Sequence, residues 1–359
     1  MSITAIVPVW NGRELLERLL ASLEIQTEAA AELLVVDNGS TDGAPELARA
    51  RGARVIPMGR NAGFAAAVNR GIRESRGDWI AVLNSDVELA PDYFAKLLAA
   101  CGAGPRGHPL AAGVSQPGQT PPAAERAPPE PGATNWFATG KILAEGSDGR
   151  IDATFDLLCR GGAAWRVGNG RADGSAFSLA RPIWSAPWTA ALFRAELFQR
   201  VGLLEESFES YLEDVDFGLR CAAQGLAGQY VPEALAWHRG SATLGRWHPE
   251  TVRRMARNQL WLLARHYPRR LLVGWSWPIL VAQLLWGALA FRHGAGLAWL
   301  RGEWQGLRGF FATRGQTLEA EVLSSVLGTN EDLIRSVQAS TGFDIYWRVY
   351  FLLTRGGAK

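Results

Sequence analysis

The run Trp79-Ile80-Ala81-Val82-Leu83-Asn84-Ser85-Asp86 decides the fold of this chain. Its first five residues are apolar, and an amide, a hydroxyl and a carboxylate follow directly. Such a run is typical of a strand that is buried on both faces of a parallel sheet. Open α/β sheets bind ligands at the carboxyl ends of their strands, so we expect Asp86 at the mouth of a cleft. An ordinary strand and turn is the alternative, because Asn, Ser and Asp are common turn residues.

Two earlier apolar runs end in the same way. The first covers residues 3–10 and is followed by Asn11-Gly12. The second covers residues 33–36 and runs into the polar stretch Asp37-Asn38-Gly39-Ser40-Thr41-Asp42-Gly43. Three strand-like runs with polar ends predict that several functional side chains meet at one edge of a sheet.

Each of these strands is followed by a segment with helical features. Pro45 suits the first turn of a helix, where its missing N–H is not needed, and another helix is expected to open at residues 61–69. After the first strand, five leucines share one helical face: Leu15, Leu16, Leu19, Leu20 and Leu23. Strands that alternate with helices predict an α/β fold with a parallel, doubly wound sheet.

Composition narrows the class of protein. The chain has 359 residues, of which 48% are hydrophobic and 20% charged, as in a folded protein with one large domain or two smaller ones. Its net charge of +2 gives no reason to expect nucleic-acid binding. An odd number of cysteines without a motif, Cys101, Cys159 and Cys221, predicts reduced, mostly buried thiols. The first strand begins at Ile3 with no signal peptide before it, so we expect a cytoplasmic protein.

The composition also divides the chain. We expect a catalytic domain over residues 1–245 and a helical C-terminal region over residues 246–359. Within this domain we expect two halves, residues 1–100 and residues 136–245. Residues 101–135 lie between them and are rich in proline, which predicts a flexible loop.

Order is expected to return unevenly after this loop. The stretch from Lys141 to Ser178 is rich in glycine and polar residues, so we expect it to be only partly ordered. Helices are predicted at residues 194–198 and 211–220.

One stretch of the C-terminal region raises the question of a membrane. Residues 271–291 carry no charge and reach the length of a membrane span, but they contain Pro278 and Gln283. Arginines flank both ends, which disfavours a single span. We therefore expect this segment to lie in the cytoplasmic face of a membrane, with a buried interface and a true span as alternatives.

Two further features of this region fit a membrane. Residues 343–353 form a second aromatic, arginine-bearing segment. Arg253, Arg254 and Arg257 would add attraction to anionic lipid. The alternative is a solvated helical face that packs on the catalytic domain.

Four motifs in order give the chain a family resemblance: Asp37-Asn38-Gly39-Ser40, Asn84-Ser85-Asp86, Glu213-Asp214-Val215-Asp216 and Trp237-His238-Arg239-Gly240-Ser241. From Ile3 to about Thr243 the sequence resembles the family 2 glycosyltransferases with the GT-A fold, and among them the bacterial rhamnosyltransferase-like members. The resemblance implies an inverting, metal-dependent enzyme that transfers a sugar from a nucleotide-diphosphate sugar to a hydroxyl. It also implies a Rossmann-like, mostly parallel sheet with a C-terminal helical extension. Residues 1–100 would then be the nucleotide-sugar-binding half of the domain and residues 136–245 its acceptor and catalytic half, with a membrane-associating C-terminal region after them.

The resemblance assigns the donor site first. Pro8, Val9 and Asp37 would contact the base and the ribose. Asn61 and Gly63 correspond to the next donor-site segment, where a small residue lets the backbone approach a ligand. A turn role for Asp37 and a helix cap at Asn61–Gly63 are the alternatives.

A metal site follows from the resemblance as well. The family motif is Asp-x-Asp or a variant, and Asn84-Ser85-Asp86 has an amide in the first position, so only Asp86 takes the metal role. Asn84 and Ser85 remain with Asp86 in the nucleotide-sugar site. His238 would close the metal site, because a histidine after the next strand does so in the family. A carboxylate, an imidazole and diphosphate oxygens suit Mn²⁺ or Mg²⁺.

The acidic motif supplies the catalytic base in this resemblance. Asp214 would take the proton from the acceptor hydroxyl, a step worth about 10²–10⁴ in rate, while Glu213 would bind acceptor hydroxyls. Asp216 and Arg220 are expected to brace the helix. In-line attack opposite the departing diphosphate would invert the anomeric centre. The alternative is that these carboxylates are solvated at a helix start, where the dipole favours them.

Three other functions stay open at this point. A sugar nucleotidyltransferase would share the nucleotide-binding architecture, although residues 9–13 are a poor triphosphate loop. A non-catalytic nucleotide-sugar-binding module would keep the fold without turnover. A processive synthase would need Gln-x-x-Arg-Trp, but Thr243 stands in place of Gln before Arg246-Trp247.

The partners are expected as follows. The resemblance favours a dTDP- or UDP-sugar as donor. The basic, Trp-rich C-terminal region suggests a glycan or lipid-linked glycan acceptor in cell-envelope polysaccharide synthesis. The enzyme would then be cytoplasmic and peripheral on the inner face of the cell membrane.

Overall fold

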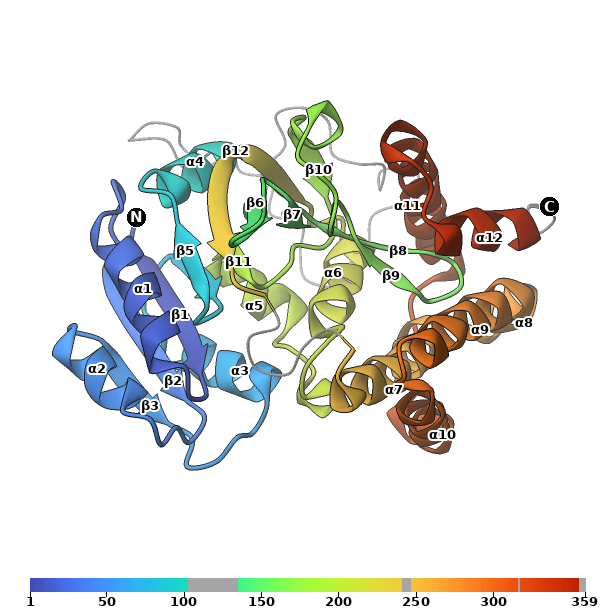
Figure 1. The fold of residues 1–359 in the computed structure, drawn as a ribbon, viewed down its shortest axis with the longest axis horizontal. Coiled ribbons are helices and arrows are strands. Elements are labelled where there is room, and N and C mark those ends of the chain that lie inside the picture. Colours follow the sequence, from blue (N-terminus) through green and yellow to red (C-terminus); the bar gives the residue numbers. More distant parts are fainter. Residues whose placement is uncertain (103–134, 241–246, 316, 355–359) are drawn as a thin grey trace.

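The computed structural model describes residues 1–102, 135–240, 247–315 and 317–354. The proline-rich stretch predicted as a flexible loop lies almost entirely outside the described residues, as do residues 241–246 with Ser241, Thr243 and Arg246. Within the described residues, ten strands form one central sheet with helices around it (Figure 1).

The central sheet has the strand order β10-β12-β6-β11-β4-β1-β2-β3, with β5 paired to β12 and β7 to β6. Its strands are β1 (Ile3–Val9), β2 (Glu32–Asp37), β3 (Arg54–Pro57), β4 (Trp79–Leu83), β5 (Val87–Leu89), β6 (Phe137–Ala144), β7 (Ile151–Ala153), β10 (Arg181–Ile183), β11 (Ala190–Arg194) and β12 (Gly228–His238). A separate pair is formed by β8 (Asp156–Leu158) and β9 (Ala164–Arg166).

The N-terminal part of the sheet confirms the predicted α/β architecture. Strand β1 pairs in parallel with β2 on one side and β4 on the other, and β2 pairs in parallel with β3. The residues of β4 are buried throughout, as its apolar sequence predicted. The sheet becomes mixed beyond β4, because β11 runs antiparallel to it.

Six α-helices lie in the described part of residues 1–245, and all except the one at residues 93–100 were predicted. They are α1 (Arg13–Glu24), α2 (Ala44–Ala50), α3 (Phe64–Glu74), α4 (Tyr93–Ala100), α5 (Ala195–Val201) and α6 (Glu213–Ala223), with short 3₁₀ turns at Ser175–Phe177 and Glu206–Phe208. In α1, four of the five predicted leucines are buried, and Pro45 stands in the first turn of α2. The three cysteines are free and buried, as predicted.

The structure corrects the expectation of partial order after the proline-rich stretch. Strand β6 lies inside the sheet between β12 and β11. Part of the glycine content that argued against order has a packing cause, because a Cβ at Gly161 would lie 2.6 Å from the carbonyl oxygen of Pro278. Lys141 is buried as well and is neutralised by Asp173 at 2.8 Å.

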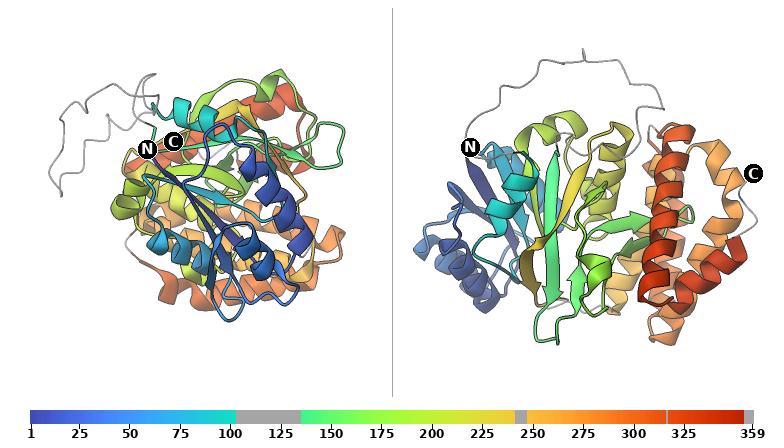
Figure 2. Two further views of the ribbon diagram at one scale, coloured as in Figure 1. Left: turned by 90° about the vertical axis from the view of Figure 1, so that its left-hand side faces the viewer. Right: turned by 90° about the horizontal axis from the view of Figure 1, so that it is seen from above.

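Six helices form the C-terminal region: α7 (Pro249–His266), α8 (Arg269–Gly274), α9 (Ser276–Arg292), α10 (Gly296–Thr313), α11 (Ala320–Thr341) and α12 (Ile345–Thr354). They gather at the end of the molecule opposite α1 and α2 (Figures 1 and 2). Ile334, Trp347 and Tyr350 join a hydrophobic core that also contains sheet residues such as Ile6 and Phe193. The C-terminal helices therefore share a hydrophobic core with the domain formed by residues 1–245.

Three expectations about the membrane change with the structure. In the described part of the chain, no helix has both the length and the apolar character that a bilayer crossing requires. Residues 271–291 are divided between α8 and α9. In α12, Trp347, Tyr350 and Phe351 are buried, which favours packing over a wholly lipid-facing segment.

The basic cluster of α7 is engaged within the protein. Arg253 and Arg254 both pair with Glu250, and Arg257 pairs with Glu209 at 2.9 Å. These arginines are at most a quarter exposed. Two glutamates thus offset most of the charge of three mostly buried arginines, which argues against the predicted attraction of this cluster to lipid.

Candidate active site

Strands β5 and β12 bring the two predicted metal ligands together. Asp86 stands directly before β5, and the antiparallel register places His238 opposite Val87. His238 Nε2 then lies 3.1 Å from Asp86 Oδ1, and the backbone N–H of Arg239 donates to the Asp86 carbonyl at 3.1 Å. Two residues far apart in the sequence thus form one contact at the edge of the sheet.

A second carboxylate holds the other side of the imidazole. Asp152, in β7, places Oδ2 2.8 Å from His238 Nδ1. When the Nδ1 proton is donated to Asp152, the lone pair of Nε2 is free for a cation, as in the carboxylate–histidine–metal arrangement. Sequence reasoning missed Asp152, because it lies in the glycine-rich stretch and belongs to no motif.

The donor set fits a hard divalent cation. Neighbouring ligands around an octahedral ion with bonds of about 2.1 Å are about 3 Å apart, as Asp86 Oδ1 and His238 Nε2 are. Within the described ranges there is no group of three or more His, Cys, Asp or Glu side chains arranged to hold a metal. A cation here would take two ligands from the protein and complete its shell with phosphate oxygens and water, as Mg²⁺ commonly does.

The electrostatics of His238 reflect its two partners. Burial lowers the pKa of His238, but its hydrogen bonds to Asp152 and Asp86 and their negative charges outweigh burial and raise the pKa to about 9. A bound cation would replace the proton on Nε2, because a histidine ligand must be neutral.

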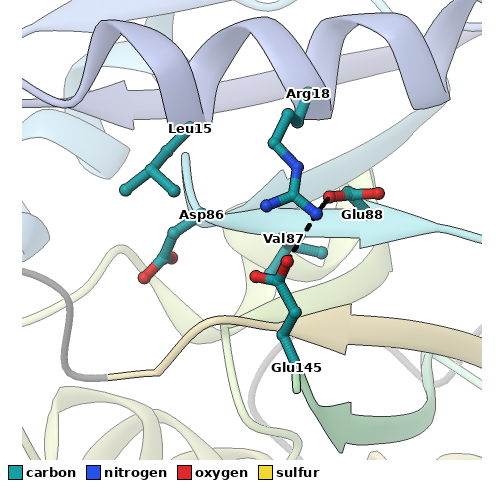
Figure 3. A pocket seen from close by; sticks show the side chains of 6 residues that line it. All are labelled: Leu15, Arg18, Asp86, Val87, Glu88 and Glu145. Atoms are coloured by element: carbon teal, nitrogen blue, oxygen red, sulfur yellow. Dashed lines mark ion pairs between the residues drawn. The ribbon is translucent and has the colours of Figure 1, made fainter.

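A small recess lies beside Asp86 (Figure 3). Arg18 of α1 reaches into it and pairs with Glu88 and with Glu145, the latter at 2.5 Å. The Asp86 side chain points away from this group (Figure 3). Arg18 therefore ties α1 to the strands behind Asp86, and its charge is taken up by two glutamates.

The acidic motif opens α6 and is held by an arginine that sequence reasoning also missed. Arg166, at the end of β9, lies 3.1 Å from Asp214 Oδ2 and 3.2 Å from Asp156 Oδ1. Ser185 donates to the backbone carbonyl of Asp214 at 3.3 Å. The side chain predicted to act as the base is thus fixed in position by a bridging guanidinium.

Burial sets the protonation of the two acidic residues. For Asp214, burial and the charge of Asp156 raise the pKa and Arg166 lowers it, which leaves a pKa of about 7. Burial and the charge of Asp214 raise the pKa of Glu213 well above its usual value, so its neutral form is favoured more than in an exposed glutamate. Among the described residues, its buried Oε2 has no hydrogen-bond partner.

Arg166 also links the two clusters. Burial lowers the pKa of Arg166, but the charges of Asp156, Asp214 and Asp152 raise it overall. Asp152 is the residue that holds His238. The predicted metal ligands and the predicted base therefore belong to one charge network, which is carried by the segment from β7 to β9.

The remaining members of the acidic motif stabilise α6. Asp216 is fully buried and contacts His266 at 2.8 Å, Arg265 at 3.1 Å and Arg220 at 2.9 Å. Burial raises the pKa of Asp216, but these partners lower it far below its usual value. The contacts agree with the bracing role expected for Asp216 and Arg220.

The segment before α6 has an unusual backbone. Glu209, Tyr211 and Leu212 all have positive φ angles, between 61° and 73°, which side-chain-bearing residues rarely adopt. Asn258 of α7 holds this segment by donating to the carbonyls of Phe208, Ser210 and Tyr211, at 3.0, 3.0 and 2.8 Å. The C-terminal region thus fixes the approach to Glu213 and Asp214.

The predicted donor-site residues lie at the ends of β1 and β2 and before α3. Val9, which follows Pro8 in β1, is paired with Asp37 in the parallel register. Asp37 Oδ1 accepts from the backbone N–H of Ser40 at 2.8 Å, so its turn role is present. Asn38 connects the end of β2 to the loop before α3, where its Oδ1 accepts from the Ala62 N–H at 3.3 Å.

At the start of α3 the structure gives a packing reason for a glycine. Asn61 Oδ1 accepts from the Gly63 N–H at 3.1 Å and closes a turn before the helix. Gly63 has a φ of 90°, and a Cβ there would lie 2.8 Å from the carbonyl oxygen of Glu209. The close approach to the backbone before α6 requires glycine at this position, whatever its role toward a ligand.

Asn84 and Ser85 complete the predicted site. Both are half-buried after the carboxyl end of β4, next to Asp86. The Asn84 N–H donates to the carbonyl of Thr189 at 2.9 Å, which fixes the backbone and leaves its amide side chain at the sheet edge.

Sequence comparison with known proteins identifies the family of this chain. The family model for glycosyl transferase family 2 matches residues 4–130. The chain is similar to N-acetylglucosaminyl-diphospho-decaprenol L-rhamnosyltransferase of Mycobacterium tuberculosis, with 33% identity over 245 residues that cover 64% of this chain and 74% of the relative. It is also similar to the succinoglycan biosynthesis protein ExoO of Rhizobium meliloti, with 35% identity over 99 residues that cover 27% of this chain and 28% of that protein.

A solved structure shares the fold. The structure of GalNAc-T7 with UDP, GalNAc and Mn²⁺ superposes with a TM-score of 0.56 and 12% identity, over 87% of this chain and 56% of that one. At this identity the likeness concerns the fold, which is GT-A. With a family model and a long, one-third-identical relative in agreement, the chain belongs to glycosyl transferase family 2 and is a glycosyltransferase.

Proposed function

We propose that this enzyme is an inverting, metal-dependent glycosyltransferase that moves a sugar from a nucleotide-diphosphate sugar to a hydroxyl of a cell-envelope glycan. The observation that carries the proposal is the charge network in which Arg166 holds Asp214 while Asp152 holds His238 against Asp86. It supports a site with a cation-binding side and a proton-accepting side.

The cation-binding side is assigned to Asp86 and His238. A divalent cation bound there, Mn²⁺ or Mg²⁺, would act as a Lewis acid that offsets the negative charge of the leaving diphosphate. Asp152 would keep the His238 ring in the tautomer that binds a cation. Asn84 and Ser85 would contact the nucleotide sugar from the same sheet edge, and the ends of β1 and β2 would bind the nucleoside.

The proton-accepting side is assigned to Asp214. As the acceptor oxygen forms its bond to the anomeric carbon, the bond from that carbon to the diphosphate oxygen breaks, and the hydroxyl proton passes to Asp214. With a pKa of about 7, Asp214 is partly ionised at neutral pH and is well matched to this task. In its neutral form, which its raised pKa favours, Glu213 would donate a hydrogen bond to another oxygen of the acceptor.

The partners are proposed from the relatives. The rhamnosyltransferase relative is named for an N-acetylglucosaminyl-diphospho-decaprenol acceptor, which supports a lipid-linked glycan as the acceptor here. A dTDP- or UDP-sugar is the proposed donor. A lipid-linked acceptor is held at a membrane, so the enzyme would work as a peripheral protein on the cytoplasmic face of the cell membrane.

Donor binding and transfer, measured separately, test this function. We expect a thermal shift with dTDP or UDP that depends on Mn²⁺, and transfer from the matching nucleotide sugar that stops in excess EDTA and returns with added Mn²⁺. The variant D214N should keep the thermal shift and lose transfer. Wild-type binding with no turnover of any donor would favour the binding-only module, and turnover that persists in EDTA would exclude the metal role.

A further inference from the structure

Helix α10 has its small residues inside and its large apolar residues outside. Gly302 and Gly306 are buried against α7. A Cβ at Gly302 would collide with the backbone carbonyl of Arg253, and one at Gly306 would lie 2.8 Å from the Leu260 side chain. Paired small residues four positions apart let two helices approach closely, and this packing is frequent between helices in membranes.

The large apolar residues of α10 form one continuous stripe. Their spacing of three and four residues places them on the same helical face. Phe311 is 83% exposed, Leu297 81% and Leu307 62%. We call this face the outer stripe: Leu297, Leu300, Trp304, Leu307 and Phe311.

Helix α9 packs against α10 and also exposes large apolar side chains while its small residues are buried. Its Ala282, Gly287 and Ala290 are buried, whereas Leu284 and Phe291 are each 55% exposed. An amphipathic helix in water normally presents its apolar side to the core and its polar side to solvent. Two adjacent helices with the reverse arrangement indicate that their outer surroundings are apolar.

The charge around the outer stripe indicates what covers it. Residues 269–314 contain six arginines and one acidic residue, although the whole chain has a net charge of only +2. Arg292, Arg301 and Arg308 are exposed beside the stripe. A symmetric dimer through this face would bring the same arginines of both copies together, which is unfavourable. An anionic lipid surface would complement them.

We propose that the outer stripe is a membrane-contact surface, with its apolar side chains in the headgroup region of an anionic bilayer and the arginines at the lipid phosphates. The sequence pointed to residues 271–291 and 343–353 for such contact, and did not single out α10. The inference goes beyond the transferase activity and does not depend on it.

Site-specific labelling tests the location of the contact. The three native cysteines are buried, so an exposed cysteine introduced by F311C can be labelled selectively with an environment-sensitive fluorophore. We expect its emission to shift to the blue with vesicles that contain about a third phosphatidylglycerol. Ile25 is 60% exposed on α1, and the label on I25C should not respond. Equal responses at both positions, or at neither, would overturn the proposal.

Vesicle flotation tests the energetics. We expect L297Q/L307Q/F311Q to weaken binding to the anionic vesicles at least tenfold, and R301Q/R308Q to weaken it by about fivefold for each arginine removed. The matched control I25Q/L179Q, which removes two equally exposed apolar side chains elsewhere, should bind as wild type.

Two controls separate this proposal from others. Transfer to a water-soluble acceptor should be unchanged in the triple variant, so a failed activity proposal cannot be mistaken for a failed surface. Undiminished flotation of the triple variant would refute the proposal. So would a wild-type protein that ignores vesicles but forms dimers in solution that the triple variant loses.

Discussion

His238 is held between two carboxylates, with Asp152 2.8 Å from Nδ1 on one side of the ring and Asp86 3.1 Å from Nε2 on the other. Asp86 comes from the strand end that decides the fold, whereas Asp152 comes from a short strand of no recognisable motif. We infer different roles for the two carboxylates: Asp86 would bind the cation, whereas Asp152 orients the His238 ring and is a positioning residue.

Replacing Asp152 should therefore act through the cation. D152N removes the acceptor that fixes the imidazole, and we expect the Mn²⁺ concentration for half-maximal activity to rise about 10–100-fold, with most of kcat restored at saturating Mn²⁺. Metal titrations of activity measure this. D148N, at an exposed position four residues earlier, is the control and should behave as wild type. A loss of kcat that no Mn²⁺ concentration restores would contradict a positioning role.

The pH dependence of transfer should report Asp214. The base must be ionised, and its pKa is about 7, so kcat/KM should fall as the pH drops below 7 and reach a plateau above it. Arg166 lowers this pKa, so R166Q should move the acid limb to higher pH, and R166K should move it less. R150Q, which removes an arginine far more exposed, should leave the profile in place. If the acid limb of the kcat/KM profile did not move in R166Q, Arg166 would not be the group that lowers the pKa of the catalytic base.

Replacing Glu213 by glutamine should leave most of the transferase activity. Because burial and the charge of Asp214 favour the neutral form of Glu213, E213Q imitates that form, since it is neutral and keeps a hydrogen-bond donor. We expect E213Q to retain most of kcat with a modest increase in the KM for the acceptor, and E213A to raise that KM by tenfold or more. If E213Q lost transfer as completely as D214N, the roles of the two carboxylates would have to be exchanged.

Asn258 should couple the C-terminal region to catalysis. N258A leaves three carbonyls of the strained segment without their donor, and we expect a loss of about 1–3 kcal/mol in the free energy of unfolding, together with a reduced kcat. Denaturant unfolding and steady-state kinetics measure the two effects. The exposed Gln224 offers a control, because Q224A removes only a weak contact at 3.5 Å. Full activity in N258A would show that the backbone before α6 holds its shape unaided.

A chain that ends at residue 270 should not fold as a stable enzyme. It would lack Ile334, Trp347 and Tyr350 from the core, and it would leave Arg160 without Glu331, which pairs with it at 2.9 Å. Circular dichroism and thermal unfolding of the purified truncation test this. A cooperative transition near the wild-type Tm would mean that residues 1–270 are stable without the rest of the C-terminal region.

The sequence predicted those parts of the fold in which local pattern and tertiary role coincide. The apolar run at residues 79–83 had to be a buried strand, and its polar end had to lie at a sheet edge. The contact between Asp86 and His238 was also expected, but only through the resemblance to a family, since spacing alone does not relate residues so far apart.

What the sequence did not reveal depends on tertiary packing. The glycine-rich stretch concealed the short strands β7, β8 and β9, because a glycine such as Gly161 is required by a close contact with α9 that no local pattern records. Asp152, Asp156 and Arg166 lie in short strands, where isolated charges look like solvent-exposed residues until their partners are known. The outer stripe escaped notice because its residues look like an ordinary core-facing pattern, and only packing shows that they face outward.

Gly63 packs against the backbone of Glu209, and the Glu209 carboxylate forms an ion pair with Arg257 of α7. A methyl group at residue 63 would displace the backbone before α6 and, through Glu209, the start of the C-terminal region. Variants designed to change donor preference through the loop before α3 should therefore keep Gly63, because its replacement would also change acceptor binding.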